Sequence, residues 1–355
     1  YLKLIMAVKN LPVSPSVPPG SWFVRFYTWV LYDCIHWGLV LCIAAWQQFT
    51  TSPPILDIDN LAKRTGNVAV LTGGPRGIAL GMLKRLVQLD FTIVIGARDI
   101  KDSQRRVDEF ANSNPDLSCS KVTIFEMDLM SLASVRKFAD NVMGNFSRID
   151  LLLCNAAVIK TPYQVTEDGF ESQFQANYLS NFLLTDLLLN RLKATAKMKG
   201  SPCQIIYSSS LIYPFGKVDF KELETSTVYT PVKAYIPTKL YQVMSMLSLE
   251  KKLLGDDAQV HCYAVHPGLV LTDMANTLPV MSIITKRLSG LFRTIQQGAD
   301  TILWPAFCAD YQNRGGLYME SGMSQPIAKI ALDKEVQSNL FARSQELIAP
   351  VISSK

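Results

Sequence analysis

The sequence predicts an α/β protein: a doubly wound parallel sheet with helices on both faces, preceded by an apolar N-terminal helix that associates with a membrane. Two observations predict the sheet. Short β-rich runs alternate with amphipathic stretches from residue 67 onward, and a glycine-rich loop follows the first run. Strands that alternate with helices form βαβ units, which need a parallel sheet covered on both faces. A long apolar run before the first strand predicts the N-terminal helix.

Composition excludes several classes of protein. The 355 residues, 48% of them hydrophobic, suffice for one large domain and an appendage. The net charge of +5 is spread along the chain without a dense basic run, so no nucleic-acid partner is expected. The 7 cysteines and 3 histidines form no metal-ligand spacing, and an odd cysteine count disfavours a disulfide framework. We therefore expect no metal site.

The apolar run at residues 26–46 has about the length of a bilayer-spanning helix, roughly 20 residues. Arg25, Asp33 and His36 fall on one face of that helix, which fits a helix seated at the membrane interface equally well. A third interpretation is an arm docked on its own domain or on a partner. We expect residues 1–50 to carry a membrane-anchor helix at about 22–46, residues 51–66 to form a linker, and residues 67–345 to form the main domain.

The expected strands follow in order along the main domain, with amphipathic helical stretches such as 81–89 and 132–146 between them. Ligands of such sheets bind beyond the carboxyl ends of the strands, near the point where the strand order reverses. Each motif discussed below falls at one of those ends. The β-rich runs occupy residues 67–72, 92–97, 122–127, 150–154, 204–209 and 260–265.

The first run leads into the loop TGGPRGIALG, from Thr72 to Gly81. Glycines between a strand and a helix let backbone N–H groups approach a pyrophosphate, whose charge the helix N-terminus favours. Taken alone, such a loop is either a cofactor loop or a tight turn.

The glycine loop is followed along the chain by the stretch CNAA at residues 154–157 and by a Pro267–Gly268 turn. Together these motifs resemble the short-chain dehydrogenase/reductase family, retinol-dehydrogenase-like branch, from about Asn67 to near Gly322. The resemblance implies a Rossmann-type fold and an oxidoreductase that uses a nicotinamide cofactor. Asp128 matches the aspartate that contacts adenine in this family. Ala79 departs from the family pattern, because it replaces the last glycine of the loop. The cofactor-binding residues that the resemblance implies are Thr72, Gly73, Gly77, Ile78, Asp128, Asn155, Pro267, Gly268 and Thr272.

The pattern Tyr-x-x-x-Lys, which serves as an acid/base pair in this family, occurs more than once. A cation beside a phenol lowers the pKa of that phenol by roughly 1 to 3 units, so the two side chains must share one face of a helix. The candidate pairs are Tyr213 with Lys217, Tyr229 with Lys233, and Tyr235 with Lys239.

Only the last pair meets that requirement. Tyr213 and Lys217 bracket a turn sequence, and Thr230 followed by Pro231 predicts a helix start that leaves Tyr229 outside. Tyr235 and Lys239 then lie within the helix, on one face. Pro237 lies between them, so a kink or a later helix start is expected.

The catalytic roles follow from the reaction. A carbonyl that receives hydride develops negative charge on oxygen, which an acid and a second donor must meet. Tyr235 is the expected acid, and Lys239 is expected to lower its pKa. By resemblance, Lys239 also holds the nicotinamide ribose, Ser210 rather than Ser209 is the second donor, and Asn177 holds a water that links the lysine to solvent.

NADP(H) is favoured over NAD(H) as the cofactor. NAD-preferring relatives carry an acid at the end of the second strand, where this chain has Ala97 followed by Arg98, and Arg76 lies in the glycine loop. Two guanidinium groups suit a 2′-phosphate. Asp99 follows directly and weakens this preference.

The apolar stretch at residues 278–292 is either a substrate lid or an ordinary core helix. Together with the apolar N-terminus it suggests a lipophilic carbonyl or alcohol as the substrate, a membrane as a partner and the endoplasmic reticulum as the location, with the catalytic domain in the cytosol. A homodimer is possible. The alternative function is a pseudoenzyme that binds nucleotide as a membrane-bound scaffold, because Ala79 and Pro237 depart from the family pattern. No G-x-S-x-G elbow of a hydrolase is present.

Overall fold

A computed structural model describes residues 50–159, 163–219, 229, 231–270 and 292–353. The predicted helix at 22–46, Thr272 and nearly all of the stretch at 278–292 lie outside the described residues. Among the described helices, none combines the length and the apolar character needed to cross a bilayer.

The fold is built on one sheet whose strand order is β3-β2-β1-β4-β5-β6-β7-β8. Neighbouring strands run parallel except for β7 and β8, which are antiparallel. The order reverses between β1 and β4, which creates a crevice at the carboxyl ends of these two strands. The strands are β1 Val68–Thr72, β2 Thr92–Ala97, β3 Val122–Glu126, β4 Leu151–Cys154, β5 Cys203–Ser208, β6 Val260–His266, β7 Leu317–Glu320 and β8 Met323–Gln325.

The predicted parallel sheet is confirmed, and each of the six expected strands is present with ends that shift by at most one residue. The sequence analysis missed β7 and β8, which have only 4 and 3 residues. β4 is as short as β7, but its sequence LLLC is an unbroken apolar run, whereas LYME and MSQ contain polar residues and give no such signal.

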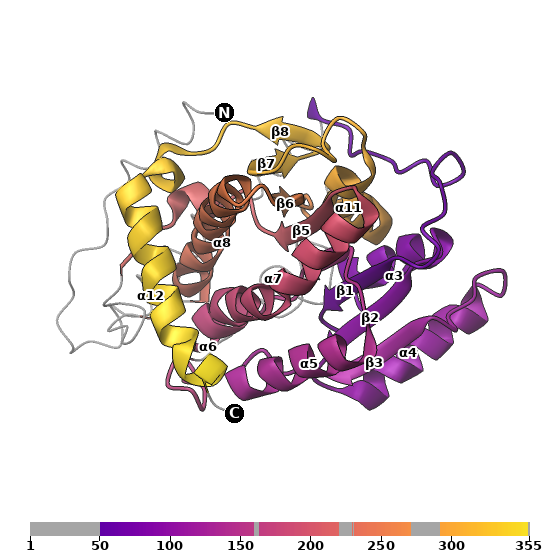
Figure 1. Cartoon of the computed structure of the whole chain (residues 1–355), viewed down its shortest axis with the longest axis horizontal. Helices are drawn as coiled ribbons and strands as arrows, with labels where there is room; N and C mark the ends of the chain where they lie inside the picture. The colour runs from indigo at the N-terminus through magenta and orange to yellow at the C-terminus, as the bar shows by residue number, and fades with distance from the viewer. Residues whose placement is uncertain (1–49, 160–162, 220–228, 230, 271–291, 354–355) are drawn as a thin grey trace.

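Helices cover both faces of the sheet, as Figure 1 shows. The helices α3 (Ile78–Gln88), α4 (Ile100–Ser113) and α11 (Ile295–Phe307) bury their apolar residues against one face. Those on the other face are α5 (Leu132–Asn145), α7 (Ser180–Lys199), α8 (Pro231–Gly255) and α12 (Lys334–Ser353). Shorter elements are α6 (Ser172–Phe174), the π-helical turn η1 (Gln175–Leu179), and the 3-10 turns η2 (Tyr213–Phe215) and η4 (Lys329–Leu332).

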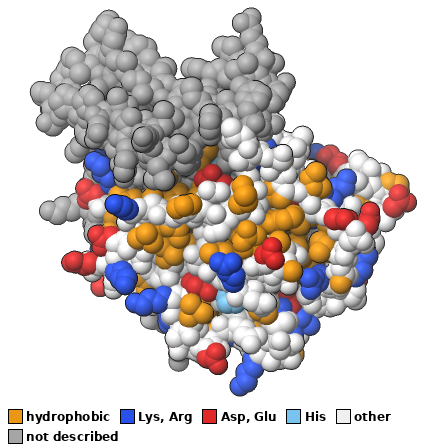
Figure 2. All heavy atoms as spheres, turned by 90° about the horizontal axis from the view of Figure 1, so that it is seen from above, with side chains coloured by type: hydrophobic (Ala, Val, Ile, Leu, Met, Phe, Trp, Pro, Cys, Tyr) orange, Lys and Arg blue, Asp and Glu red, His pale blue; other side chains and the backbone are white. Residues whose placement is uncertain are grey.

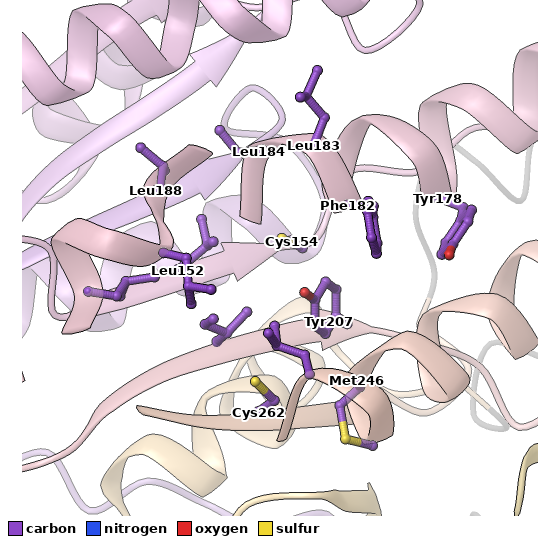
Figure 3. Close-up of a cluster of buried hydrophobic side chains, with 14 of the residues drawn as sticks. Leu152, Cys154, Tyr178, Phe182, Leu183, Leu184, Leu188, Tyr207, Met246 and Cys262 are labelled. Carbon is purple, nitrogen blue, oxygen red and sulfur yellow. The ribbon is translucent and has the colours of Figure 1, made fainter. Parts of the chain in front are cut away.

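The larger core lies between the sheet and α7 and α8. Leu152 of β4, Tyr207 of β5 and Cys262 of β6 point from the central strands toward these helices (Figure 3). Leu188 of α7 is fully buried against them. Burying each such side chain contributes about 1.5 to 3 kcal/mol, so this core holds the central strand ends in fixed positions.

The segment 51–66, predicted as a linker, has no helix or strand but packs on the domain. Leu56 and Ile58 are buried in the core next to α3 and α11. The N–H of Leu56 donates to Asp300 Oδ2 over 3.4 Å. At the other end, α12 continues to Ser353, beyond the expected boundary at residue 345.

Candidate active site

A cavity of about 570 Å³ opens at the carboxyl ends of the central strands. Its volume lies in the range typical of cofactor and substrate sites. Most of the predicted site residues line it: Gly73, Arg76, Gly77, Ile78, Arg98, Asp128, Asn155, Ser210, Tyr235, Lys239, Pro267 and Gly268.

The glycine loop has the shape of a phosphate cradle. Gly73 has φ of +94°, a conformation that L side chains rarely adopt, and a Cβ there would lie 3.1 Å from the Ala156 Cβ. A Cβ on Gly74 would lie 2.7 Å from the Ser103 Oγ. Within the described chain, the N–H groups of Gly77 and Ile78 at the start of α3 make no hydrogen bond. These free donors fit the phosphates of a dinucleotide.

Thr72 supports the cavity from behind rather than lining it. Its side chain is fully buried, and its Oγ1 accepts hydrogen bonds from the N–H groups of Asn155 and Ala156, both at 3.0 Å. The Oγ of Ser208 donates to Asn155 Oδ1 at 3.0 Å. These contacts join the ends of β1, β4 and β5 into one rigid rim.

The two predicted arginines, Arg76 and Arg98, both line the cavity. Asp99 is the N-cap of α4, where its Oδ1 accepts the N–H of Asp102 at 2.9 Å. Arg76 pairs with Asp102 at 3.3 Å, whereas Arg98 is exposed and makes no hydrogen bond or ion pair within the described residues. Asp128 also lines the cavity, and its Oδ1 accepts the Met130 N–H at 2.9 Å.

Ala79, the departure from the glycine pattern, fits its position. It is 2% exposed and packs in the core on the α3 face of the sheet. A tight contact of α3 with α11 lies two residues later, at Gly81, where a Cβ would lie 2.8 Å from the Ala299 Cβ. The extra methyl at Ala79 therefore does not block the fold.

The helix that carries the chosen tyrosine begins at Pro231, as predicted, and continues without a break to Gly255. The later start that Pro237 suggested is not found. Proline has no N–H to donate within a helix. Thr238 Oγ1 donates to the Tyr235 carbonyl at 2.6 Å. Tyr235 and Lys239 consequently lie one turn apart on the cavity side of α8.

The two rejected tyrosines serve the structure. Tyr213 is buried in the core, and its hydroxyl oxygen accepts the N–H of Ala328 at 2.8 Å. Tyr229 lies outside α8, and its hydroxyl oxygen accepts the side-chain amide of Gln173 at 2.8 Å. Neither tyrosine lines the cavity.

The electrostatics of Tyr235 differ from the prediction. Burial raises the pKa of its phenol above the usual value of 10, and no neighbouring charge offsets this effect. The expected lowering by Lys239 is absent, because the lysine Nζ lies over the ring, 5.2 Å from its centroid. The sequence predicted the neighbours correctly but not the position of the ammonium.

Lys239 is itself buried, with 2% of its surface exposed. Its Nζ donates to the Ser208 carbonyl at 2.7 Å and to Gln242 Oε1 at 3.2 Å. Burial lowers the pKa of its ammonium to about 7, because desolvation disfavours the charged form.

The two serines after β5 have different hydrogen-bond partners. Ser210 lines the cavity, with a long contact of 3.5 Å from the Ile212 N–H to its Oγ. Ser209 Oγ donates instead to the Lys239 carbonyl at 3.3 Å. The hydroxyl of Ser210 therefore remains available to a ligand.

Asn177 lies in the π-helical turn η1 and does not line the cavity. Its side chain accepts the N–H of Val158 at 2.7 Å and donates to the carbonyl of Val158 at 2.9 Å. Its backbone carbonyl accepts the side-chain amide of Gln242 at 2.8 Å. The link between Lys239 and Asn177 thus passes through Gln242, a residue that the sequence analysis did not select.

The sequence analysis also missed His266 and the apolar wall of the cavity. His266 ends β6, is 4% exposed, and has no hydrogen-bond partner for either ring nitrogen within the described residues. Burial, together with Arg293 and Lys239, lowers the pKa of its imidazole to about 3. Its position at a strand end, directly before the Pro267–Gly268 turn, was the available signal.

Comparison with known proteins shows the family of this chain. Residues 67–281 match the family described as short chain dehydrogenase. The chain belongs to the short-chain dehydrogenase/reductase family. Members of this family are oxidoreductases that act on CH–OH and C=O groups, and the relatives place this chain in the retinol-dehydrogenase-like branch.

Two characterised relatives are similar to this chain in sequence over most of their length. A polyprenol dehydrogenase of Danio rerio is 32% identical over 293 residues, which cover 82% of this chain and 89% of the relative. Retinol dehydrogenase 12 of Mus musculus is 31% identical over 283 residues, covering 80% and 86%.

Solved structures share the fold of this short-chain dehydrogenase/reductase. An uncharacterized protein from Mycobacterium paratuberculosis matches with a TM-score of 0.65 and 25% identity, covering 83% of this chain and 97% of that one. The NADPH-bound carbonyl reductase from chicken fatty liver matches with a TM-score of 0.56 and 21% identity, covering 75% and 100%.

Proposed function

We propose that this protein is a membrane-associated, NADP(H)-dependent oxidoreductase that interconverts a lipophilic carbonyl compound and its alcohol. One observation carries the proposal: the side chains packed around Tyr235 form a separate apolar cluster that lines the cavity. The cluster consists of Leu211, Ile212, Phe215, Val232 and Ile236. An apolar wall beside an acid/base group supports a substrate whose carbonyl is attached to a hydrocarbon.

The residues present fit a nicotinamide dinucleotide, which supplies or accepts the hydride when bound. In the reducing direction, the hydroxyl of Tyr235 donates its proton to the developing alkoxide oxygen. The hydroxyl of Ser210 donates a hydrogen bond to the same oxygen, which stabilises the negative charge as it forms. In the oxidising direction, the Tyr235 oxygen takes the proton back.

Lys239 lies one turn from Tyr235, with its Nζ 5.2 Å from the centre of the phenol ring. It does not lower the pKa of Tyr235, so its role in this proposal is to hold the ribose of the nicotinamide cofactor. The Tyr235 hydroxyl makes no hydrogen bond within the described residues, so it is free to contact a substrate.

The adenosine end supports NADP(H). The Asp99 carboxylate caps α4, which weakens its candidacy as a ligand of the ribose hydroxyls. Arg98 has a free guanidinium at the cavity rim, suited to a 2′-phosphate.

Membrane association is part of the proposal. The expected anchor helix at about 22–46 would hold the domain at a membrane, for which we propose the cytosolic side of the endoplasmic reticulum. Figure 2 shows hydrophobic side chains gathered in a band across the face seen from above. The relatives named for polyprenol and retinol support a substrate drawn from lipid. A homodimer is compatible with the proposal but is not required by it.

The test is an assay of the purified full chain with polyprenyl, retinoid, steroid and fatty carbonyl compounds, each with NADPH and NADH. We expect saturable turnover with at least one compound and a preference for NADPH. The variant Tyr235→Phe keeps the ring but lacks the acid, so its kcat should fall about 10²- to 10⁴-fold. Its affinity for NADPH should be retained.

If Tyr235→Phe keeps the wild-type turnover, Tyr235 is not the acid/base residue. Saturable NADPH binding without turnover on any compound would instead favour the nucleotide-binding scaffold.

A further inference from the structure

The ammonium of Lys239 is held by contacts that leave one N–H unassigned. An ammonium carries three donors, and two of them are used on Ser208 and Gln242. The side chain lines the cavity, so the remaining donor is the one available to a ligand. Its direction depends on the positions of the other two acceptors.

One acceptor is fixed and the other is a side chain. The Ser208 carbonyl belongs to β5 in the middle of the sheet and cannot move independently. Gln242 is 2% exposed and lies three residues after Lys239, on the same face of α8. Its amide is held at both ends: Oε1 accepts from Lys239 at 3.2 Å, and Nε2 donates to the Asn177 carbonyl at 2.8 Å.

The orientation of this amide follows from its neighbours. An ammonium can only donate and a carbonyl can only accept, so the oxygen must face Lys239 and the nitrogen must face Asn177. A carboxylate at position 242 would retain the acceptor but would face the carbonyl with a second oxygen. A methionine would have similar length but would provide neither good contact.

The acceptor on the opposite side belongs to an unusual turn. Asn177 lies in the π-helical turn η1, and such turns occur frequently at functional sites. The Asn177 side chain is occupied by Val158, which lines the cavity, and its carbonyl by Gln242 and Asn181. The turn therefore connects the cavity wall to the lysine through one amide.

We propose that Gln242 is a positioning residue for the reaction, an amide clamp that orients the Lys239 ammonium between the Ser208 carbonyl and the π-helical turn. The inference rests on the proposed function, because it assigns Lys239 a role in turnover. Gln242 does not line the cavity, and it acts only through Lys239.

The clamp also affects the charge of the lysine. The titratable groups that face Lys239 are Tyr235 on α8 and His266 on β6, with Arg293 near His266. No carboxylate of the described residues bonds the ammonium. Gln242 Oε1 and the Ser208 carbonyl are therefore the groups that stabilise its charged form, and loss of one of them should lower the pKa of Lys239 further.

The test compares Gln242→Met and Gln242→Glu by the pH dependence of kcat/KM and by NADPH titration. Activity that needs charged Lys239 falls as pH rises through the pKa of Lys239. We expect Gln242→Met to lower kcat/KM at neutral pH about tenfold or more and to move the basic limb to lower pH. Gln242→Glu should move that limb to higher pH, because a carboxylate favours the charged ammonium.

Gln204→Met is the matched control, since Gln204 is also buried but lies on β5, near the start of that strand. It should leave both the limb and kcat/KM unchanged. If Gln242→Met keeps the wild-type limb and kcat/KM, or if both substitutions at 242 lower kcat/KM without moving the limb, the clamp is overturned. A wild type that turns over no compound overturns the proposed function, and with it this inference, before any variant is measured.

Discussion

Tyr235 illustrates how far sequence reasoning reaches at the scale of a residue. A helix start at Pro231 excluded Tyr229, and a turn excluded Tyr213, so elementary rules selected one pair among three. The pKa of Tyr235 did not follow from those rules. It depends on burial by residues distant in sequence and on the place of the Lys239 Nζ over the ring.

Arg98 carries a prediction about cofactor choice. Arg98→Ala should weaken NADPH binding about tenfold to a hundredfold, because a hydrogen bond to a charged group contributes about 1.5 to 3 kcal/mol. NADH binding should be unchanged, since NADH lacks the 2′-phosphate. The measurement is a fluorescence titration with both dinucleotides.

Arg105→Ala serves as the control for Arg98. Arg105 lies on the neighbouring helix α4, pairs with Asp102 and Glu109, and does not line the cavity. Equal losses for NADPH and NADH in Arg98→Ala would refute a 2′-phosphate contact.

At the scale of elements, α8 stays helical although it contains a proline between the two proposed catalytic residues. Pro237 lies inside the helix, yet α8 is continuous, and Thr238 bonds the Tyr235 carbonyl. Tertiary packing of the buried face of α8 outweighs the local cost of the proline, about 3 kcal/mol. The sequence could indicate the conflict but not its outcome.

The contact of α3 with α11 carries a prediction about stability. Gly81→Ala would place a Cβ 2.8 Å from the Ala299 Cβ and 2.9 Å from the Ile295 carbonyl oxygen. We expect the free energy of unfolding to fall by about 1 to 3 kcal/mol, the usual effect of overpacking. Urea denaturation measures the change.

Gly144→Ala in α5 is the control, because the added methyl group meets open space. Nothing lies within 4 Å of its Cβ position, so this variant should gain about 0.4 to 1 kcal/mol from reduced freedom of the unfolded chain. Equal effects at the two glycines would show that helix propensity, not the crossing of α3 and α11, decides the result.

At the scale of the whole molecule, the burial of Lys239 makes the free energy of unfolding depend on pH. The pKa of Lys239 is about 7 in the folded protein, below its ordinary value of 10.5. Between these values the unfolded chain holds a proton that the folded chain has lost. Stability should therefore rise with pH in this window, by at most about 1.4 kcal/mol per pH unit.

Lys239→Met should remove this slope and be more stable than wild type at pH 7. Lys251→Met, which changes an exposed lysine of the same helix, should keep the wild-type slope. Urea denaturation at pH 7, 8 and 9 separates the two variants. A slope that survives in Lys239→Met would assign the pH dependence to another group.

The N-terminal segment carries a prediction about location. The full chain should float with phosphatidylcholine vesicles in a density gradient, because the apolar run at 26–46 can enter the bilayer. A chain without residues 1–49 should remain in the soluble fraction and retain NADPH binding. Flotation of the shortened chain would show that the surface of the domain, and not the N-terminal segment, binds the membrane.

The sequence by itself determined the parallel sheet, its strands β1 to β6, the glycine loop and the placement of Tyr235 and Lys239 on one face of a helix. These features depend on local periodicity, turn residues and helix spacing, all of which can be read along the chain. Only the tertiary structure decided that Thr72 and Asn177 act from behind the cavity, that His266 lines it unpaired, and that Gln242 holds Lys239. Those roles arise from contacts between residues far apart in sequence, whose geometry exists only after the helices pack on the sheet.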